Sequence, residues 1–214
     1  MVKAIAFDCF GVAADYSIPG SEANLASFTG VTVEDMCEFL RLAGRAEFAV
    51  GAISAESFRQ RLNRLLPAPI SMPALTCCWT STYKPRVDCI HFAVSFRQFA
   101  KVPVWLWSNM NEIDRAWLKV HGVIAAFDGL VGSDEILERK PENGFYHQAV
   151  AVMERALGQH LEPFDIFLLD DSRPSVEKAQ SLGMRASQYV DSRSLSAVSN
   201  AMQTDRSCHQ PQGE

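Results

Sequence analysis

Long hydrophobic runs are absent from this sequence of 214 residues. No apolar stretch approaches the ~20 residues that a membrane-spanning helix needs. Asp8 interrupts the first apolar stretch after only four residues, Ala4 to Phe7, whereas the apolar centre of a secretory signal needs about 7–15 residues. We therefore expect a cytoplasmic protein that does not interact with membranes.

An excess of basic residues is also lacking. Lys and Arg number 20 against 25 Asp and Glu, which gives a net charge of −5 and a pI near 5.6. This balance argues against a surface that binds nucleic acid. With 48% hydrophobic and 21% charged residues, the composition is that of a folded globular protein. We expect a small-molecule substrate as the partner, and the oligomeric state stays open, a homodimer included.

Cysteines and histidines with metal-binding spacing are lacking too. The six cysteines (Cys9, Cys37, Cys77, Cys78, Cys89, Cys208) follow no regular pattern, and no histidine lies at zinc-finger distance from them. None of the five histidines has a partner at the spacing of a metal site or a catalytic triad. Reduced thiols and structural or surface histidines are the expectation.

What the sequence does contain is a repeated alternation of strand and helix patterns. Short apolar runs that end in polar residues predict strands at Lys3–Phe7, Val102–Trp107, Gly129–Val131, Ile166–Leu169 and Arg185–Val190. Apolar residues at helical spacing predict helices at Asp88–Phe99, Glu112–Val120, Asn143–Leu157 and Pro174–Leu182. This alternation predicts an α/β fold, a doubly wound parallel sheet of the Rossmann-like kind.

Residues 15–83 break the alternation and show no strand pattern. Thr32 and Ser54 are predicted to cap helices that run through Leu42 and Leu66. We predict a helical insertion, a cap domain at 15–83, within an α/β core formed by residues 1–14 and 84–202. A weak helix is expected near Leu195–Met202, followed by a disordered tail at 203–214.

The predicted strand ends carry an ordered set of reactive side chains. Asp8 follows the first strand, Ser108 the second, and Asp170-Asp171 a later one, while Lys140 precedes a helix. In doubly wound sheets the ligand lies beyond these strand ends. A carboxylate can attack phosphorus or carbon and form a covalent ester, and a hydroxyl and an ammonium can hold the oxygens of the transferred group. Adjacent carboxylates near a third suit Mg²⁺.

Four motifs that contain these residues resemble, in order, those of the haloacid dehalogenase-like (HAD-like) hydrolases. They are FDCFGV at 7–12, WSNM at 107–110, RKPENGFY at 139–146 and LLDDSRPSVEKAQSLGM at 168–184. The resemblance covers residues 3–190, and the helical insertion resembles the cap domain that part of this superfamily carries after its first motif.

The resemblance implies a role for each matching residue. Asp8 matches the nucleophile, Ser108 the hydroxyl that binds the transferred group, and Lys140 the lysine that stabilises charge. Asp170 and Asp171 match the acidic pair that binds Mg²⁺, with Asp8 and the backbone carbonyl of Phe10 as further ligands. Asn109 and Phe10 are expected beside the substrate. In the insertion, Arg41 and Arg45 are candidates for binding a substrate anion, with solvent-facing positions as the alternative.

Phe10 departs from the pattern, because most phosphatases of this superfamily carry a second Asp two positions after the nucleophile. That Asp acts as general acid and base, and Phe10 cannot do so. Three hypotheses remain open: a Mg²⁺-dependent phosphatase of a small phosphorylated metabolite, a 2-haloacid dehalogenase, or a catalytically weak binding or regulatory relative. Phe10 favours the dehalogenase, and Asp170-Asp171 favours the phosphatase. Residues 15–83 contain no lysine, which excludes phosphonate cleavage through a cap lysine.

Overall fold

A five-stranded parallel sheet forms the centre of the described chain, residues 2–207 of a computed structural model. The strand order is β5-β4-β1-β6-β7, and every neighbouring pair is parallel. The strands are β1 (Ala4–Phe7), β4 (Val104–Ser108), β5 (Gly129–Gly132), β6 (Ile166–Asp170) and β7 (Arg185–Gln188). The α/β fold and each strand predicted from the apolar runs are thus confirmed.

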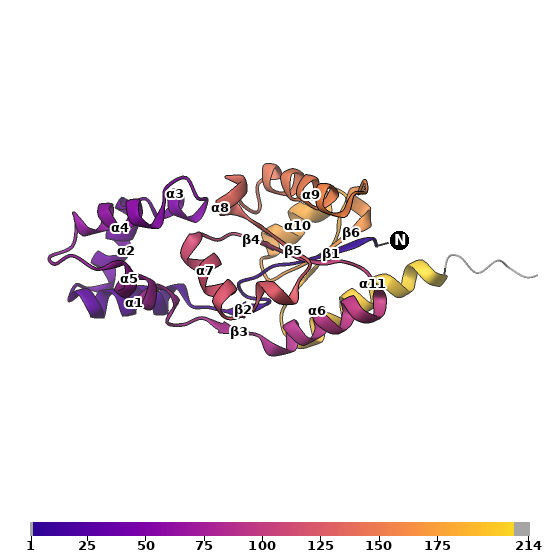
Figure 1. Ribbon diagram of the computed structural model, residues 1–214, viewed down its shortest axis with the longest axis horizontal. Helices are drawn as coiled ribbons and strands as arrows, with labels where there is room; N and C mark the ends of the chain where they lie inside the picture. The colour runs from indigo at the N-terminus through magenta and orange to yellow at the C-terminus, as the bar shows by residue number, and fades with distance from the viewer. Residues whose placement is uncertain (1, 208–214) are drawn as a thin grey trace, which may run out of the picture.

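Helices cover both faces of this sheet. Successive strand residues point to opposite faces, and all four residues of β1 are apolar and buried, so both faces need a cover. Ile5 and Phe7 of β1 belong to a buried cluster with Cys89 of α6 (Val87–Ala100) and Val198 of α11 (Ser196–Ser207). Ala4 and Ala6 belong to a second cluster on the opposite face, against α9 (Asn143–Leu157) and α10 (Arg173–Ser181). Figure 1 shows these two layers above and below the sheet.

Shorter elements complete the core. They are α7 (Glu112–Val120), α8 (Ser133–Ile136) and the 3₁₀ turns Ile124–Ala126, Pro163–Asp165 and Ser192–Leu195. Helix α11 continues to Ser207, past Met202, where the sequence analysis ends it. The rest of the predicted tail, 208–214, lies outside the described residues. Within residues 2–207, no helix has both the length and the apolarity required to cross a membrane.

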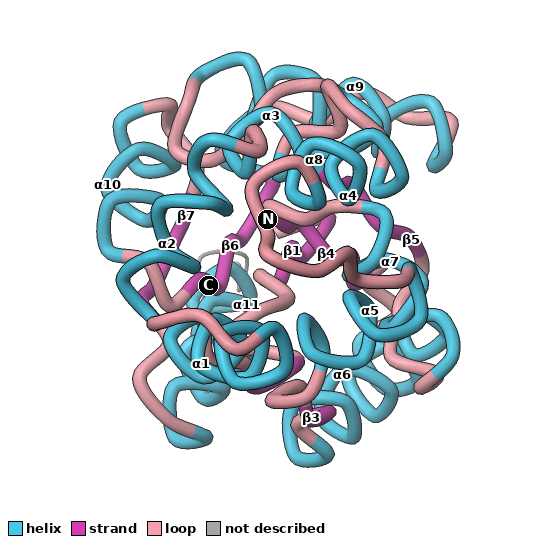
Figure 2. Tube along the Cα trace, turned by 90° about the vertical axis from the view of Figure 1, so that its left-hand side faces the viewer, coloured by secondary structure: helices cyan, strands magenta, loops and turns pink. Residues whose placement is uncertain are grey.

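A group of helices projects from one end of the sheet and follows the first strand in sequence. These helices are α1 (Ile18–Thr29), α2 (Val33–Leu42), α3 (Arg45–Ala49), α4 (Ala55–Asn63) and α5 (Met72–Thr80). We call residues 18–80 the helical bundle. The chain enters and leaves it through an antiparallel ribbon of β2 (Ala14–Asp15) and β3 (Lys84–Pro85). Figure 2, viewed from the bundle side, shows the bundle helices in front of the strands of the sheet.

The helical bundle has a hydrophobic core of its own. Phe48 and Phe58 stack with ring centroids 4.7 Å apart, and both rings form T-shaped contacts with Trp79. The predicted caps are confirmed, because the hydroxyls of Thr32 and Ser54 accept the N–H groups of Asp35 and Ser57. A cap satisfies backbone donors that the first helical turn otherwise leaves unpaired.

The carboxylate of Asp114 in α7 ties the bundle to the core. Its Oδ1 accepts hydrogen bonds from the indole N–H of Trp79 at 2.9 Å and the hydroxyl of Tyr83 at 2.8 Å. Both donors come from the C-terminal end of the bundle and the chain that leaves it. Asp114 is buried, and desolvation raises its pKa to about 6, although hydrogen bonds from Asn111, Tyr83 and Trp79 oppose the shift.

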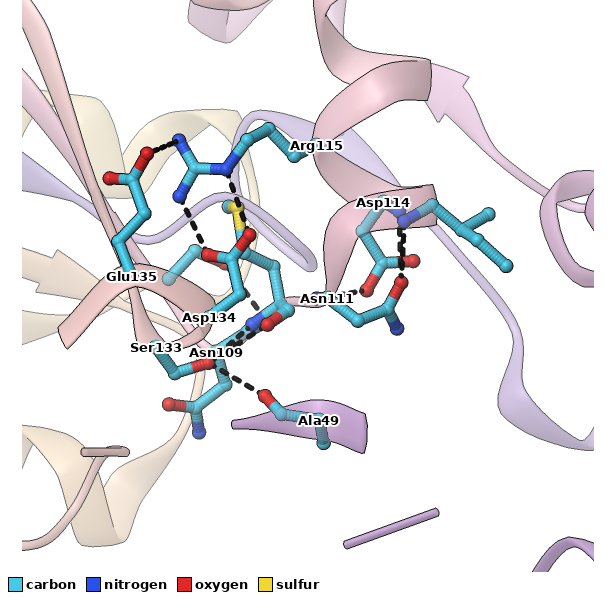
Figure 3. Close-up of polar contacts among 11 residues, drawn as sticks. Ala49, Asn109, Asn111, Asp114, Arg115, Ser133, Asp134 and Glu135 are labelled. Atoms are coloured by element: carbon cyan, nitrogen blue, oxygen red, sulfur yellow. Dashed lines mark hydrogen bonds and ion pairs between the residues drawn. The ribbon is translucent and has the colours of Figure 1, made fainter. Parts of the chain in front are cut away.

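A second junction lies at Ser133, at the start of α8. Its hydroxyl donates to the backbone carbonyl of Ala49 at 2.8 Å and accepts the backbone N–H of Met110 at 2.8 Å. Figure 3 shows Ser133 beside Asn109, with the Ala49 carbonyl pointing toward it. The two junctions hold the bundle over the ends of the strands.

The Asp114 carboxylate predicts a pH dependence of stability. A free Asp side chain has a pKa of about 3.9. Because the pKa is about 6 in the folded chain, the contribution of Asp114 to the free energy of unfolding is fully present below about pH 4. This contribution is lost as the pH rises through 6. The shift of roughly two units corresponds to about 3 kcal/mol.

Asp114→Asn removes this titration. We expect the difference in free energy of unfolding, wild type minus variant, to fall by up to about 3 kcal/mol between pH 4 and pH 7 and then stay level. Urea denaturation of both proteins across this range measures it. A difference independent of pH would show that Asp114 titrates alike in the folded and unfolded chain.

Candidate active site

The reactive residues lie at the carboxyl ends of three adjacent strands. Strand β1 lies between β4 and β6, so Asp8 directly after β1 is flanked by Ser108, the last residue of β4, and by Asp170, the last residue of β6. Beyond β1 the chain adds β4 and β5 on one side and β6 and β7 on the other. Such a reversal of strand order opens a crevice at the strand ends.

The buried ammonium of Lys140 joins two of the carboxylates. Its Nζ lies 2.9 Å from Oδ1 of Asp8 and 2.6 Å from Oδ2 of Asp170, and it donates to the carbonyl of Trp107 at 2.9 Å. Burial alone would lower the pKa of Lys140, but the charges of Asp170 and Asp8 outweigh it and hold the pKa above its ordinary value. Lys140 is therefore a fixed positive charge at this site.

Asp8 is buried against more negative than positive charge. Desolvation and the neighbouring charge of Asp170 raise its pKa well above the ordinary value, and Lys140 offsets only part of this. Its Oδ1 also accepts the backbone N–H of Cys9 at 2.6 Å. A further positive charge beside Asp8 would favour the ionised form, the form in which a carboxylate is nucleophilic.

Asp8, Asp170 and Asp171 form an acidic cluster that fits a divalent metal ion. One oxygen from each carboxylate lies within 4.8 Å of the others, and hard oxygen ligands of this kind suit Mg²⁺. Lys140 is the one cation among the described residues that line this cavity. Three carboxylates against one ammonium leave an excess of negative charge, which a bound cation would neutralise.

The Asp171 carboxylate lies close against Gly11. The Gly11 φ of +99° lies in the left-handed region, and a Cβ at this position would lie 2.2 Å from Oδ2 of Asp171. Only glycine permits this approach without displacing the carboxylate. The amide of Gln188 donates to the backbone carbonyl of Asp171 at 2.9 Å, and the N–H of Ser172 donates to Oδ1 of Asp170 at 2.8 Å.

These residues surround a cavity of about 220 Å³, which we call the acidic cavity. Its lining includes most of the residues that the sequence singled out: Asp8, Phe10, Ser108, Asn109, Lys140, Asp170 and Asp171. Asn109 also forms a reciprocal pair with the backbone of Lys140. Its Oδ1 accepts the Lys140 N–H at 2.8 Å, and its Nδ2 donates to the Lys140 carbonyl at 2.9 Å. Asn109 therefore fixes the loop that carries the lysine.

Comparison with solved structures finds this architecture in enzymes of one superfamily. A HAD family enzyme from Bacteroides thetaiotaomicron, in complex with magnesium and inorganic phosphate, is 21% identical, with a TM-score of 0.75 over 89% of this chain and 95% of its own. A predicted HAD-like family hydrolase from Porphyromonas gingivalis is 18% identical, with a TM-score of 0.75 over 94% and 98% of the two chains. The chain has the HAD-like fold.

A third HAD-like structure is an L-2-haloacid dehalogenase from Xanthobacter autotrophicus with chloropropionic acid covalently bound. It is 16% identical, with a TM-score of 0.60 over 96% of this chain and 88% of its own. No protein-family model matches the chain, and comparison with curated proteins finds no match. The fold is shared by this dehalogenase and by a HAD phosphatase from Thermococcus onnurineus, so the site residues must decide between the two reactions.

The two arginines proposed for anion binding have different positions in this HAD-like fold. Arg41 does not line the acidic cavity; its side chain is 68% exposed and pairs with Glu38 at 2.6 Å. The reason is helical geometry, because the preceding residue, Leu40, occupies the buried face of α2 and the next residue points about 100° away from it. Arg45 lies in a second cavity beside the acidic one.

Three residues of the acidic cavity were missed by sequence analysis: Tyr16, Ser172 and Ser175. Ser172 directly follows the acidic pair, and this adjacency was a usable signal. Tyr16 offered none, because its position depends on how the chain leaves β2 toward the bundle.

Gly11→Ala tests whether Asp171 belongs to a metal site. The new methyl group should displace the carboxylate, and we expect Mg²⁺ affinity to fall at least about tenfold. Calorimetric titration with Mg²⁺ measures this affinity.

Gly30→Ala is the matched control. Gly30 also has a positive φ, +74°, but a Cβ there would meet nothing within 4 Å. Both variants should lose about 1–2 kcal/mol of stability through backbone strain, and only Gly11→Ala should bind Mg²⁺ more weakly. Equal Mg²⁺ affinity in the two variants would remove Asp171 from the site.

Proposed function

We propose that this chain is a Mg²⁺-dependent phosphatase that acts on a small phosphorylated metabolite through a phospho-Asp8 intermediate. The observation that carries the proposal is the acidic cluster of Asp8, Asp170 and Asp171 around a single buried lysine. A dianionic phosphoryl group needs cationic neutralisation before a carboxylate can approach it. The magnesium and phosphate bound in the Bacteroides thetaiotaomicron structure support the same assignment.

The proposed reaction has two steps. In the first, a carboxylate oxygen of Asp8 attacks phosphorus, the bond between phosphorus and the leaving-group oxygen breaks, and the electron pair leaves with that oxygen. In the second, water attacks the phospho-Asp8 ester and releases inorganic phosphate and free Asp8. Lys140 and the Ser108 hydroxyl hold the phosphoryl oxygens throughout. Asp8, Asp170 and Asp171 would hold Mg²⁺, which would supply positive charge for these oxygens.

The helical bundle is proposed to act as a cap. It lies over the strand ends and is held there by the Asp114 and Ser133 contacts. A covered site excludes bulk water and strengthens the electrostatic interactions within it.

A 2-haloacid dehalogenase is the second candidate, and Phe10 is the observation that favours it. Halide leaves without a proton, so that reaction does not need an acid at position 10. The dehalogenase from Xanthobacter autotrophicus shares the fold. Against this stands the acidic cluster, which a carbon-centred displacement does not require. A catalytically weak binding protein is the remaining alternative.

Asp8→Asn and metal removal test the proposed reaction together. The amide cannot act as the nucleophile, so turnover of phosphate esters should fall by roughly 10³-fold or more. Wild-type activity should vanish in excess chelator and return with Mg²⁺. Circular dichroism checks that the variant is folded. Dechlorination of 2-chloropropionate that persists in chelator would make the dehalogenase the better assignment.

Phe10→Asp tests the missing acid. An alkoxide leaving group needs protonation and a phenolate needs it much less, so the wild type should hydrolyse alkyl phosphates poorly relative to aryl phosphates. The new carboxyl should raise the ratio of alkyl to aryl rates, by at most the ~10²–10⁴ that general acid–base catalysis provides. Phe10→Leu is the control for lost ring packing and should leave the ratio unchanged. Equal alkyl and aryl rates in the wild type would show that another group supplies the proton.

A further inference from the structure

A second cavity of about 290 Å³ adjoins the acidic cavity on the side of the bundle. The two share Phe10, Tyr16 and Asn109 as lining residues, so they meet at these side chains. A substrate whose transferred group lies at Asp8 has this space for the rest of the molecule. We call it the bundle cavity.

The walls of the bundle cavity are mainly apolar and aromatic. Leu25 and Leu40 are fully buried, and Trp79 and Tyr83 contribute rings from the end of the bundle. Ile18 and Met110 lie at the same cavity. Surfaces of this kind bind apolar groups by removing them from water, and they penalise charged groups that lose hydration.

The charged residues of the bundle cavity neutralise each other. Two of its described lining residues are charged, Arg45 and Glu22, and they form a half-buried ion pair. The Arg45 guanidinium also lies over the Trp79 ring, 5.6 Å from its centroid. An ionised group on the substrate would therefore find Arg45 already paired, and a carboxylate there would be repelled by Glu22.

Phe10 lies where the two cavities meet and lines both of them. Its ring centroid lies 5.4 Å from that of Tyr16 and 5.0 Å from that of Tyr83. The position at which a proton donor would serve the leaving group is thus part of an aromatic wall. A leaving group that needs no proton, such as a phenol or another stabilised anion, suits this wall chemically as well as by shape.

We infer that the bundle cavity binds the leaving group, and that this group is uncharged away from the scissile bond, apolar and about the size of one or two rings. This inference rests on the proposed phosphatase function and names its substrate class: an aryl phosphate or a similarly activated ester of an apolar group. The volume agrees with this, since a cavity of roughly 150 Å³ holds one benzene molecule.

Acetyl phosphate and benzoyl phosphate test the inference, because both release a carboxylate and differ mainly in the ring. The wild type should show a kcat/KM at least about tenfold higher for the benzoyl ester. Ile18→Asp places a charge at the cavity and should reduce this ratio toward one.

Val33→Asp is the matched control for Ile18→Asp. Ile18 and Val33 each begin a helix after a Ser or Thr cap, and they are 43% and 42% exposed, but Val33 does not line the bundle cavity. This variant should keep the wild-type ratio. Equal turnover of the two esters by the wild type would overturn the inference and leave the phosphatase assignment standing.

Binding of 2-naphthol, measured by calorimetry without metal or phosphate, separates the cavity from the chemistry. We expect saturable binding to the wild type and to Val33→Asp, weakened at least about tenfold in Ile18→Asp. If the protein binds 2-naphthol in this way but hydrolyses no phosphate ester, the proposed function is refuted, whereas the inferred specificity of the cavity is supported. Absence of binding to the wild type would overturn the inference.

Glu22→Gln provides a gain of function. It frees Arg45 from its partner, and kcat/KM for 4-carboxyphenyl phosphate relative to phenyl phosphate should rise at least about tenfold over the wild type. An unchanged ratio would show that the ion pair does not set the charge preference and would overturn that part of the inference.

Discussion

The interaction on which the rest of the site depends is the ammonium of Lys140 between Asp8 and Asp170. Parallel strands bring their carboxyl ends to one edge of the sheet, and here that edge gathers carboxylates in a buried setting. Without a cation between them, their mutual repulsion and the cost of desolvation would oppose the fold. The hydrogen bonds from Lys140 to the Trp107 carbonyl and from Asn109 to the Lys140 backbone hold that cation in place.

A single lysine does not balance the three carboxylates of the acidic cluster. Burial and the neighbouring negative charge of Asp170 raise the pKa of Asp8, and the same negative charge would attract a divalent ion. The architecture also separates two kinds of surface. Charge and hard oxygen atoms lie in the acidic cavity, while aromatic and aliphatic side chains lie in the bundle cavity, with Phe10 at the boundary. Contacts at Asp114 and Ser133 keep the two halves together.

Particular elements show how far the sequence could be interpreted. The buried strands were found because apolar runs ending in polar residues are distinctive, and the caps at Thr32 and Ser54 were found because their hydroxyls precede helical patterns. Helix α1 was not predicted: its glycine, proline and serine content resembles a loop, and it is stabilised by packing against α5 and α2. The ribbon of β2 and β3 was missed because two-residue strands carry no periodic signal.

The sequence by itself determined the α/β class, the order of the reactive residues and their grouping at the strand ends, because hydrophobic periodicity and local motifs are encoded by residues close together in the chain. Only the tertiary structure decided which residues of the insertion face the site. Arg41 and Arg45 look alike in sequence, yet one pairs with Glu38 in solvent and the other with Glu22 in the bundle cavity. Asp114 was not singled out at all, because its donors Trp79 and Tyr83 lie 35 and 31 positions away. Contacts across such separations depend on how helices pack, which no local pattern specifies.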